Sequence, residues 1–345
     1  MRSATIIAAV AGVACALLIG VGSVGTGSRA SVFTADGAML ARLPDGRRIN
    51  LRCSGAGSPT VLLEGGYEAT SEAWYKIAPR IAKTNRVCAY DRAGLGFSDP
   101  GPLPRDGAAI AADLDLALRA ARLSGPFVVV GHSAGGLYVR LFADRRPRDV
   151  VGMVLVESSV EHQDKAFAAA FGPGVGSLKP LQDHAQACLT AARDGALPSL
   201  SPALSSCAPP AKSGETLTAG EANARQAALR GAWQTSASEI DNLMTRTSDE
   251  LDRGRPSYGD MPLVVLTAAN AFDSMPAGAP RQAVQEVWAQ LHRQIAARST
   301  RGSAQLVAGS SHMMIFDRPD AVVAAIDEVV AAARSRGTDH ARPRR

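Results

Sequence analysis

The chain has 345 residues, and 46% of them are hydrophobic, which allows one large α/β core with an insertion, or two domains. This composition excludes a disordered or a fibrous protein. The formal net charge of +5 is modest, and the basic residues are dispersed apart from the C-terminal Arg342-Pro343-Arg344-Arg345, so we expect no nucleic-acid partner.

Residues 1–30 have the pattern of an export signal. Arg2 comes first, an uncharged run from Ile6 to Val24 follows, and small residues lead to Ala30. The pattern predicts a signal peptide or, because the run is near the length that crosses a bilayer, an N-terminal membrane anchor. We therefore expect the rest of the chain to be secreted or held in the cell envelope, with an uncleaved anchor as its only membrane contact.

Cysteines after this segment can form two disulfides in an oxidising compartment, and four of them allow three pairings. Cys53 ends one predicted strand and Cys88 lies in another, whereas Cys188 and Cys207 share a later segment. We predict the bridges Cys53–Cys88 and Cys188–Cys207. Four buried free thiols are the alternative, and zinc is disfavoured because no Cys-x-x-Cys spacing is present.

Predicted strands alternate with predicted helices in the first part of the chain. A hairpin over 38–53 turns at Pro44-Asp45-Gly46. The elements that follow are strands at 60–63, 86–90, 128–130 and 151–156, and helices over 71–83, 108–121 and from 135. This alternation predicts a mostly parallel sheet with helices on both faces.

From residue 158 to 258 the alternation stops. This stretch is rich in Ala, Pro, Ser and Gln, with helical patterns around 162–171, 181–193 and 219–245. It predicts an inserted helical cap. Strands at 261–266 and 304–307 and helices over 281–298 and 319–334 then complete the core. We therefore expect a core of 31–157 and 259–335, and a flexible basic tail over 336–345.

The strongest motif joins a buried strand to a helix. The run Val128-Val129-Val130 leads into Gly131-His132-Ser133-Ala134-Gly135-Gly136, and an apolar helical pattern follows. In a G-x-S-x-G turn the glycines remove side chains that would clash, so the serine is forced into the open. Ser133 is the predicted nucleophile, and the amide of Ala134 is a predicted oxyanion donor at the helix N-terminus.

His312 is the predicted general base. It directly follows the last core strand, and the carboxyl ends of parallel strands meet at one edge of the sheet, where Ser133 also lies. His132 is the rival base. Because it is adjacent to Ser133 in sequence, we expect its side chain to project away from the nucleophile and to act as a structural neighbour.

Two acids compete to orient the base. Glu157 ends the strand after the serine helix, and Asp273 follows the next core strand in Asn270-Ala271-Phe272-Asp273. Both positions belong to the same sheet edge. We favour Glu157 because Asp273 stands about two residues later than a short strand-end loop would place it.

A second oxyanion donor is expected in the glycine turn after the strand at 60–63. The turn reads Glu64-Gly65-Gly66-Tyr67, and its glycines let the backbone approach a substrate closely. We choose the amide of Gly66, with Tyr67 as a wall or a further donor. The sequence assigns no role to Glu64.

Five motifs occur in order along the chain: Leu62-Leu63-Glu64-Gly65-Gly66, Ala89-Tyr90-Asp91-Arg92-Ala93-Gly94-Leu95-Gly96-Phe97-Ser98-Asp99-Pro100, Gly131-His132-Ser133-Ala134-Gly135-Gly136, Leu155-Val156-Glu157 and Gly309-Ser310-Ser311-His312. Together they resemble the α/β-hydrolase superfamily, over about residues 38–157 and 260–335. The resemblance implies a mostly parallel eight-stranded sheet with helices on both faces and an inserted helical cap. It also places the second strand beside the fourth, which supports Cys53–Cys88.

Two departures from the family pattern are present. Many members have His-Gly where this chain has Glu64-Gly65, and the nucleophile position holds Ser133 instead of the aspartate of haloalkane dehalogenases and epoxide hydrolases, so those two chemistries are disfavoured. In the family the loop at Asp91-Arg92 is mostly structural, and we interpret it in that way here.

The predicted function is a serine hydrolase that cleaves an ester or related acyl bond of a small apolar molecule through an acyl-enzyme, with no metal or organic cofactor. An aminopeptidase, thioesterase or acyltransferase on the same triad is the main alternative. A non-catalytic binding protein of the same fold is disfavoured by the complete set of serine, histidine and acid. The oligomeric state stays open.

Overall fold

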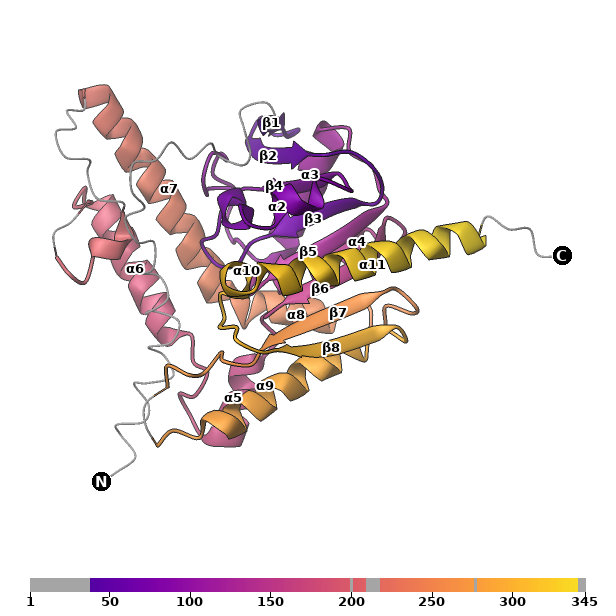
Figure 1. Cartoon of the computed structure of the whole chain (residues 1–345). Coiled ribbons are helices and arrows are strands. Elements are labelled where there is room, and N and C mark those ends of the chain that lie inside the picture. The colour runs from indigo at the N-terminus through magenta and orange to yellow at the C-terminus, as the bar shows by residue number, and fades with distance from the viewer. Residues whose placement is uncertain (1–37, 199–200, 209–217, 276–277, 341–345) are drawn as a thin grey trace.

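A computed structural model describes residues 38–198, 201–208, 218–275 and 278–340. Its centre is a single eight-stranded sheet in the order β1-β2-β4-β3-β5-β6-β7-β8, drawn in Figure 1. The first two strands pair antiparallel, β2 joins β4 antiparallel, and every later pairing is parallel. This is the predicted fold class.

The strands are β1 (Ala38–Arg42), β2 (Arg48–Ser54), β3 (Thr60–Glu64), β4 (Val87–Tyr90), β5 (Phe127–His132), β6 (Val150–Val156), β7 (Leu263–Ala268) and β8 (Gly302–Val307). The helices of the core are η2 (Ser71–Trp74), α2 (Ala78–Ile81), α3 (Gly107–Ala120), α4 (Gly135–Arg145), α9 (Arg281–Ala296), α10 (Met314–Asp317) and α11 (Pro319–His340). Between β6 and β7 lie α5 (Gln163–Phe171), α6 (Lys179–Arg193), η3 (Ser205–Cys207), α7 (Ala219–Leu243) and α8 (Arg246–Asp252).

The central strands are buried from end to end, because helices cover both faces of the sheet. All six residues of β5 and all six of β7 are buried. Helices α3, α4 and α9 pack on one face, and α2 and α11 pack on the other. Strands enclosed in this way need side chains that are apolar on both faces, which explains the unbroken run Val128-Val129-Val130.

The segment between β6 and β7 is helical, and its long helices α6 and α7 stand together beside the sheet in Figure 1. Helix α7 begins with a capping box, in which Thr218 and Glu221 satisfy each other's backbone amides. Its later half turns Trp233, Ile240 and Leu243 into a buried cluster with α6. The second half of α7 is therefore the part that is fixed against the rest of the molecule.

Two disulfides join the cysteines that the sequence pairs. Cys53 and Cys88 are direct partners in the register of β2 and β4. The other bridge links Cys188 of α6 to Cys207 of η3. Both bridges fit an oxidising compartment.

Two local expectations were wrong or incomplete. The helix expected over 71–83 is split into η2 and α2, because Pro79 starts a new helix instead of continuing one. The expected tail at 336–345 is helical as far as His340, since α11 meets no proline before Pro343. The predicted export segment, residues 1–30, lies outside the described residues.

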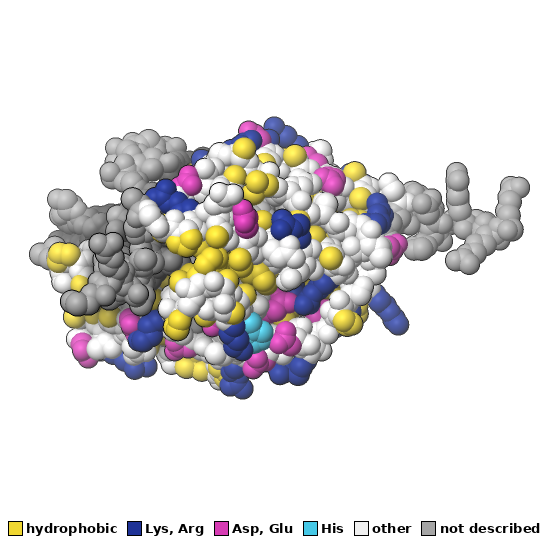
Figure 2. All heavy atoms as spheres, turned by 90° about the horizontal axis from the view of Figure 1, so that it is seen from below, with side chains coloured by type: hydrophobic (Ala, Val, Ile, Leu, Met, Phe, Trp, Pro, Cys, Tyr) yellow, Lys and Arg dark blue, Asp and Glu magenta, His cyan; other side chains and the backbone are white. Residues whose placement is uncertain are grey.

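Within the described residues, none of the helices combines the length and the apolar character that crossing a bilayer requires. On the face drawn in Figure 2, Lys and Arg side chains are scattered among Asp and Glu, and hydrophobic side chains gather near the middle. Neither sign of charge forms a continuous surface on this face.

Candidate active site

Ser133 occupies a strained turn between β5 and α4. Its φ is +53°, in the left-handed region that most residues avoid. The turn is tight enough that a Cβ on Gly131 would lie 2.5 Å from the carbonyl oxygen of Gly135. Glycine at 131 is therefore required for the turn to close. The N–H of Ser133 donates to the carbonyl oxygen of Val156 at 3.2 Å, and its carbonyl oxygen accepts the amide of Ser159 at 2.9 Å, so the end of β6 also holds the turn.

His312 lies within hydrogen-bond distance of this serine. Its Nε2 is 3.0 Å from the Ser133 hydroxyl oxygen, and the two residues are 179 positions apart in the chain. Burial, together with the nearby His132 and His292, lowers the pKa of His312 to about 3. The ring is thus neutral at physiological pH and able to accept the serine proton through Nε2.

The side chain of His132 points toward the loop of His312 and, among the described residues, forms no hydrogen bond with Ser133. Its Nε2 donates to the carbonyl oxygen of His312 at 2.8 Å, and the two ring centroids are 5.2 Å apart. Burial lowers its pKa. The contact is to the backbone of the base, so His132 supports the loop that carries His312.

Glu157 is buried beside the pair and has a φ of +45°. Its carboxylate accepts the amide of Ala268 at 2.6 Å and the indole N–H of Trp288 at 2.7 Å. Burial raises its pKa to about 8, and the two hydrogen bonds only partly oppose this effect. Strained backbone and a raised pKa at one buried acid are common features of functional sites.

Asp273 lies in a different environment. It is exposed, and its carboxylate accepts the side-chain amide of Asn270 at 2.8 Å. Among the described residues, neither Glu157 nor Asp273 forms a hydrogen bond with the ring of His312. Glu157 lines the same pocket as Ser133 and His312, and Asp273 does not.

Two side chains of α9 that belong to no predicted motif, Trp288 and His292, complete the surroundings of Glu157. Trp288 holds the carboxylate, and its ring centroid is 4.4 Å from that of His292. His292 is fully buried and donates from Nε2 to the carbonyl oxygen of Ser158 at 2.8 Å. Their i, i+4 spacing on one helix was the only available signal, and it fits an ordinary buried face equally well.

The glycine turn after β3 packs directly on Ser133. A Cβ on Gly66 would lie 3.0 Å from the Cβ of Ser133. The amides of Gly66, Tyr67 and Ala134 donate no hydrogen bond to any described residue. Free backbone amides beside a serine hydroxyl are what an oxyanion hole requires.

Behind this turn lies a buried ionic cluster that gives Glu64 a partner. Arg92 donates to the carboxylate of Glu64 at 2.9 Å and to that of Glu239, on α7, at 2.9 and 3.0 Å. The phenol of Tyr90 also donates to Glu64. The loop at Asp91-Arg92 therefore has a structural role, and this role reaches the glycine turn.

An apolar pocket of about 170 Å³ opens onto Ser133 and His312. Helices of the segment between β6 and β7 form much of its wall, together with aromatic rings of the core: Phe167, Leu178, Leu181, Ile240, Leu243, Phe272 and Trp288. Phe167 stacks on Trp288 with their ring centroids 5.8 Å apart. Apart from Glu157 and His312, the described lining carries no acidic or basic side chain.

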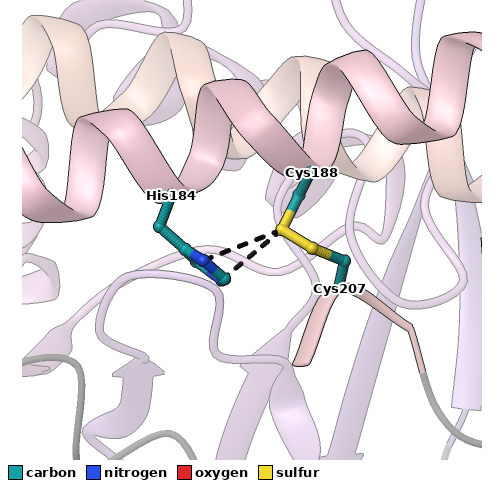
Figure 3. A group of neighbouring side chains, drawn as sticks. All are labelled: His184, Cys188 and Cys207. Carbon is teal, nitrogen blue, oxygen red and sulfur yellow. Dashed lines mark hydrogen bonds between the residues drawn. A yellow bond between two sulfur atoms is a disulfide. The ribbon is translucent and has the colours of Figure 1, made fainter. Parts of the chain in front are cut away.

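Outside the pocket, two groups of described side chains have donor atoms close enough for a metal ion. In the first, His184 Nε2 is 3.4 Å from Cys188 Sγ, but Figure 3 shows that this sulfur is bonded to that of Cys207. Sulfurs in a disulfide are not thiolate ligands. The second joins His162 to Asp249 and Asp252 at the surface, where His162 Nε2 already lies 2.8 Å from Asp252.

Residues 53–325 match the alpha/beta hydrolase family. The uncharacterized protein YqjL of Bacillus subtilis strain 168 is 25% identical over 279 residues, which cover 81% of this chain and 86% of that protein. An uncharacterized vacuolar membrane protein of Saccharomyces cerevisiae strain YJM789 is 40% identical over 104 residues. That match covers 29% of this chain and only 16% of the yeast protein.

Among solved structures, that of an epoxide hydrolase without ligand is similar, with a TM-score of 0.57 and 16% identity. The alignment covers 86% of this chain and 98% of that one. At this level of identity the likeness concerns the fold alone.

Proposed function

Because the chain belongs to the α/β-hydrolase family, we propose that it is a serine hydrolase that cleaves a carboxylic ester or a related acyl bond. One observation carries the proposal: the hydroxyl of Ser133 lies 3.0 Å from a neutral His312 at the mouth of an apolar pocket. A serine hydroxyl becomes a strong nucleophile only when a base removes its proton. Ser133, where epoxide hydrolases and dehalogenases of this fold use aspartate, argues against those two reactions.

The reaction proceeds in two halves. Ser133 Oγ attacks the acyl carbon while His312 Nε2 takes its proton, and the carbonyl oxygen becomes an oxyanion that the amides of Gly66 and Ala134 stabilise. His312 then protonates the leaving alcohol, and an acyl-enzyme remains. Water attacks the acyl carbon with His312 as base, and Ser133 recovers its proton as the acid product leaves.

Glu157 is the acid we assign to His312, with Asp273 as the alternative. When Nε2 accepts the proton of Ser133, the neutral ring carries its hydrogen on Nδ1, which needs an acceptor. Each carboxylate oxygen of Glu157 has one partner and retains a further lone pair. An ionised Glu157 would also stabilise the imidazolium that forms when the serine is deprotonated.

The substrate we propose is small and uncharged around its acyl group. The pocket volume of about 170 Å³ is below the roughly 300–1,000 Å³ range of sites for drug-sized ligands. Its aromatic and aliphatic wall offers no cation for a carboxylate or phosphate group. The two disulfides support action outside the cytoplasm.

Hydrolysis of a p-nitrophenyl ester series from acetate to palmitate tests the proposal. The protein without residues 1–30 is compared with its Ser133→Ala and His312→Ala variants. We expect a maximum at short acyl chains and a loss of about 10⁴-fold or more in both variants. Activity that persists in Ser133→Ala would overturn the proposal. Cleavage of amino-acid amides or thioesters in preference to every ester would replace the ester with another acyl bond.

A further inference from the structure

Arg92 connects the side chain of one loop to the backbone of another. The guanidinium is 1% exposed and follows β4, yet it donates to the carbonyl oxygen of Gly65 at 3.0 Å and to that of Gly66 at 2.8 Å. These two carbonyls belong to the glycine turn that packs on Ser133. One side chain therefore holds two consecutive peptide groups beside the nucleophile.

Holding these carbonyls fixes the direction of two amides. The carbonyl of Gly65 shares its peptide group with the N–H of Gly66, and the carbonyl of Gly66 shares its own with the N–H of Tyr67. In a planar trans peptide the C=O and the N–H point in opposite directions. With both carbonyls turned toward Arg92, both amides point away from it, and neither donates to another described residue.

Arg92 is itself held from the segment between β6 and β7. Glu239 on α7 accepts two hydrogen bonds from its guanidinium, at 2.9 and 3.0 Å, although the two residues are 147 positions apart. The side chain of Glu239 has no exposed surface, and Tyr138 lies with its ring centroid 5.3 Å from the guanidinium carbon. A bidentate pair of this kind sets the orientation of the guanidinium plane as well as its charge.

We propose that Arg92 and Glu239 are positioning residues of the oxyanion hole, so that this hole is correctly formed only when α7 is seated. The inference rests on the proposed function. Glu64 holds Arg92 within the core, whereas Glu239 ties the same guanidinium to the helix that also walls the pocket. The position of α7 is thereby transmitted to the amides of Gly66 and Tyr67.

Misalignment of these amides would slow the reaction step and leave substrate binding unchanged. An ester carbonyl gains little from well-aimed amides, whereas the tetrahedral oxyanion depends on them. Loss of alignment therefore lowers kcat while KM stays nearly constant. Binding of phenylboronic acid reports the same effect, because its adduct with serine is tetrahedral and places an oxygen where the oxyanion forms.

Glu239→Gln is the main variant, because it removes the charge and keeps the shape of the side chain. We expect kcat on the best p-nitrophenyl ester to fall about 10- to 100-fold, KM to change less than about twofold, and the Ki of phenylboronic acid to rise in proportion to the loss of kcat. Arg92→Lys is the second variant. A lysine ammonium cannot bridge two carbonyls and two carboxylates, so the same pattern is expected.

Asp113→Asn is the matched control. Asp113 is a buried acid of α3 that pairs with Arg47 at 2.8 Å and Arg105 at 2.7 Å, and among the described residues it forms no hydrogen bond with Arg92, Glu239 or the glycine turn. Its loss lowers the melting temperature and leaves kcat and the boronate Ki unchanged. If Glu239→Gln does not fold, as judged by circular dichroism, Arg92→Lys carries the test.

Two results are decisive. If the wild-type enzyme is active through Ser133 and a folded Glu239→Gln or Arg92→Lys variant keeps its kcat and boronate Ki, or changes only KM, the inference is overturned and the proposed function stands. If the wild-type enzyme cleaves no acyl substrate, the proposed function fails first.

Discussion

The two turns that meet at the active site are held in different ways. The turn around Ser133, where φ is +53°, is held by backbone: its glycines let it close, and backbone hydrogen bonds join Ser133 to Val156 and Ser159. The glycine turn at Gly65 and Gly66 is held by a side chain, that of Arg92, which also pairs with Glu64 and with Glu239 of a distant helix. The turns nevertheless touch, since a Cβ on Gly66 would lie 3.0 Å from that of Ser133.

In the proposed reaction, the two turns have different roles: one carries the nucleophile and the other carries oxyanion donors. The nucleophile needs a rigid, strained position, and local sequence can supply it. Oxyanion donors must be aimed within a narrow tolerance, and we propose that here their aim depends on the buried ion pair between Arg92 and Glu239. Changes in the helices between β6 and β7 should therefore disturb the glycine turn more than the nucleophile turn.

Glu157→Gln should give the largest effect and acts on the nucleophile side alone. Because the pKa of Glu157 is about 8 and that of His312 about 3, we expect kcat/KM of the wild type to rise with pH through about 8 as Glu157 ionises. The amide cannot ionise, so the variant loses this rise and about 10³-fold of the activity at pH 9. A pH profile of ester hydrolysis measures both.

The same group affects stability with a definite sign. The folded protein keeps a proton on Glu157 that the unfolded chain releases near its ordinary pKa of 4.5, so the free energy of unfolding falls as the pH rises from about 4.5 to 8. Glu157→Gln removes that fall. For the pH profile of ester hydrolysis, Glu250→Gln is the control: burial also raises the pKa of Glu250, and it also accepts a backbone amide, but it lies outside the pocket. If Glu157→Gln kept the wild-type pH profile of ester hydrolysis, Glu157 would be excluded as the acid and Asp273 would be favoured.

Gly135→Ala should have the next largest effect, because it forces the two turns apart. Its Cβ would lie 2.5 Å from the carbonyl oxygen of Gly65 and 2.6 Å from that of Glu64, and both are backbone atoms. We expect about a 100-fold loss of kcat and a loss of roughly 1–3 kcal/mol of stability. Kinetics and thermal unfolding are compared with Gly220→Ala on α7, where nothing lies within 4 Å of the added Cβ. Equal activity in both variants would contradict the close contact.

Removal of the Cys188–Cys207 bridge should disturb the glycine turn through α7, because Trp233 of α7 donates to the carbonyl oxygen of Cys207 at 2.6 Å. The bridge spans 19 positions, which corresponds to about 3 kcal/mol of stabilisation. The double serine variant should lose stability and, in the folded protein, a few-fold in kcat. The double serine variant of Cys53 and Cys88 should lose stability alone. A loss of kcat in the Cys53 and Cys88 variant, with none in the Cys188 and Cys207 variant, would contradict the proposed dependence of the glycine turn on α7.

Phe167→Ala gives the smallest effect and leaves both turns intact. It removes one wall of the pocket, where Phe167 stacks on Trp288 and meets Phe272 edge-on at 6.2 Å. The ratio of kcat/KM for octanoate over butyrate should rise about tenfold. Phe171→Ala, on the same helix but outside the pocket lining, should not change this ratio. If this ratio changed in Phe171→Ala and not in Phe167→Ala, the acyl chain would not lie against Phe167.

The sequence predicted what depends on neighbouring residues. The buried strand, the strained serine turn and the sheet order follow from short apolar runs, glycine spacing and a recognisable set of motifs. The distance between Ser133 and His312 fits the pattern as well, although their catalytic roles stay predictions. The same reasoning missed the break in the helix over 71–83, because Pro79 fits either the interior of a pattern or a new first turn.

Contacts between residues that are distant in the chain could not be predicted from the sequence. Glu239 sits in a long helical pattern with many polar positions, and nothing local indicates that its carboxylate is the one that turns inward. Glu64 and Arg92 likewise have the sequence context of charged loop residues, and only the structure shows that they form a buried ion pair. Glu157 and Asp273 both follow core strands, and in the sequence only the length of the loop favours Glu157. In the structure Glu157 is buried and lines the pocket, whereas Asp273 is exposed and does not.

The most direct measurement is covalent labelling by a fluorophosphonate, followed by mass spectrometry of the intact protein and of its peptides. We expect one adduct per chain, located on Ser133, absent in Ser133→Ala and formed far more slowly in His312→Ala. An adduct on another residue, or no adduct on a folded wild-type protein, would contradict the central claim that Ser133 is a nucleophile activated by His312.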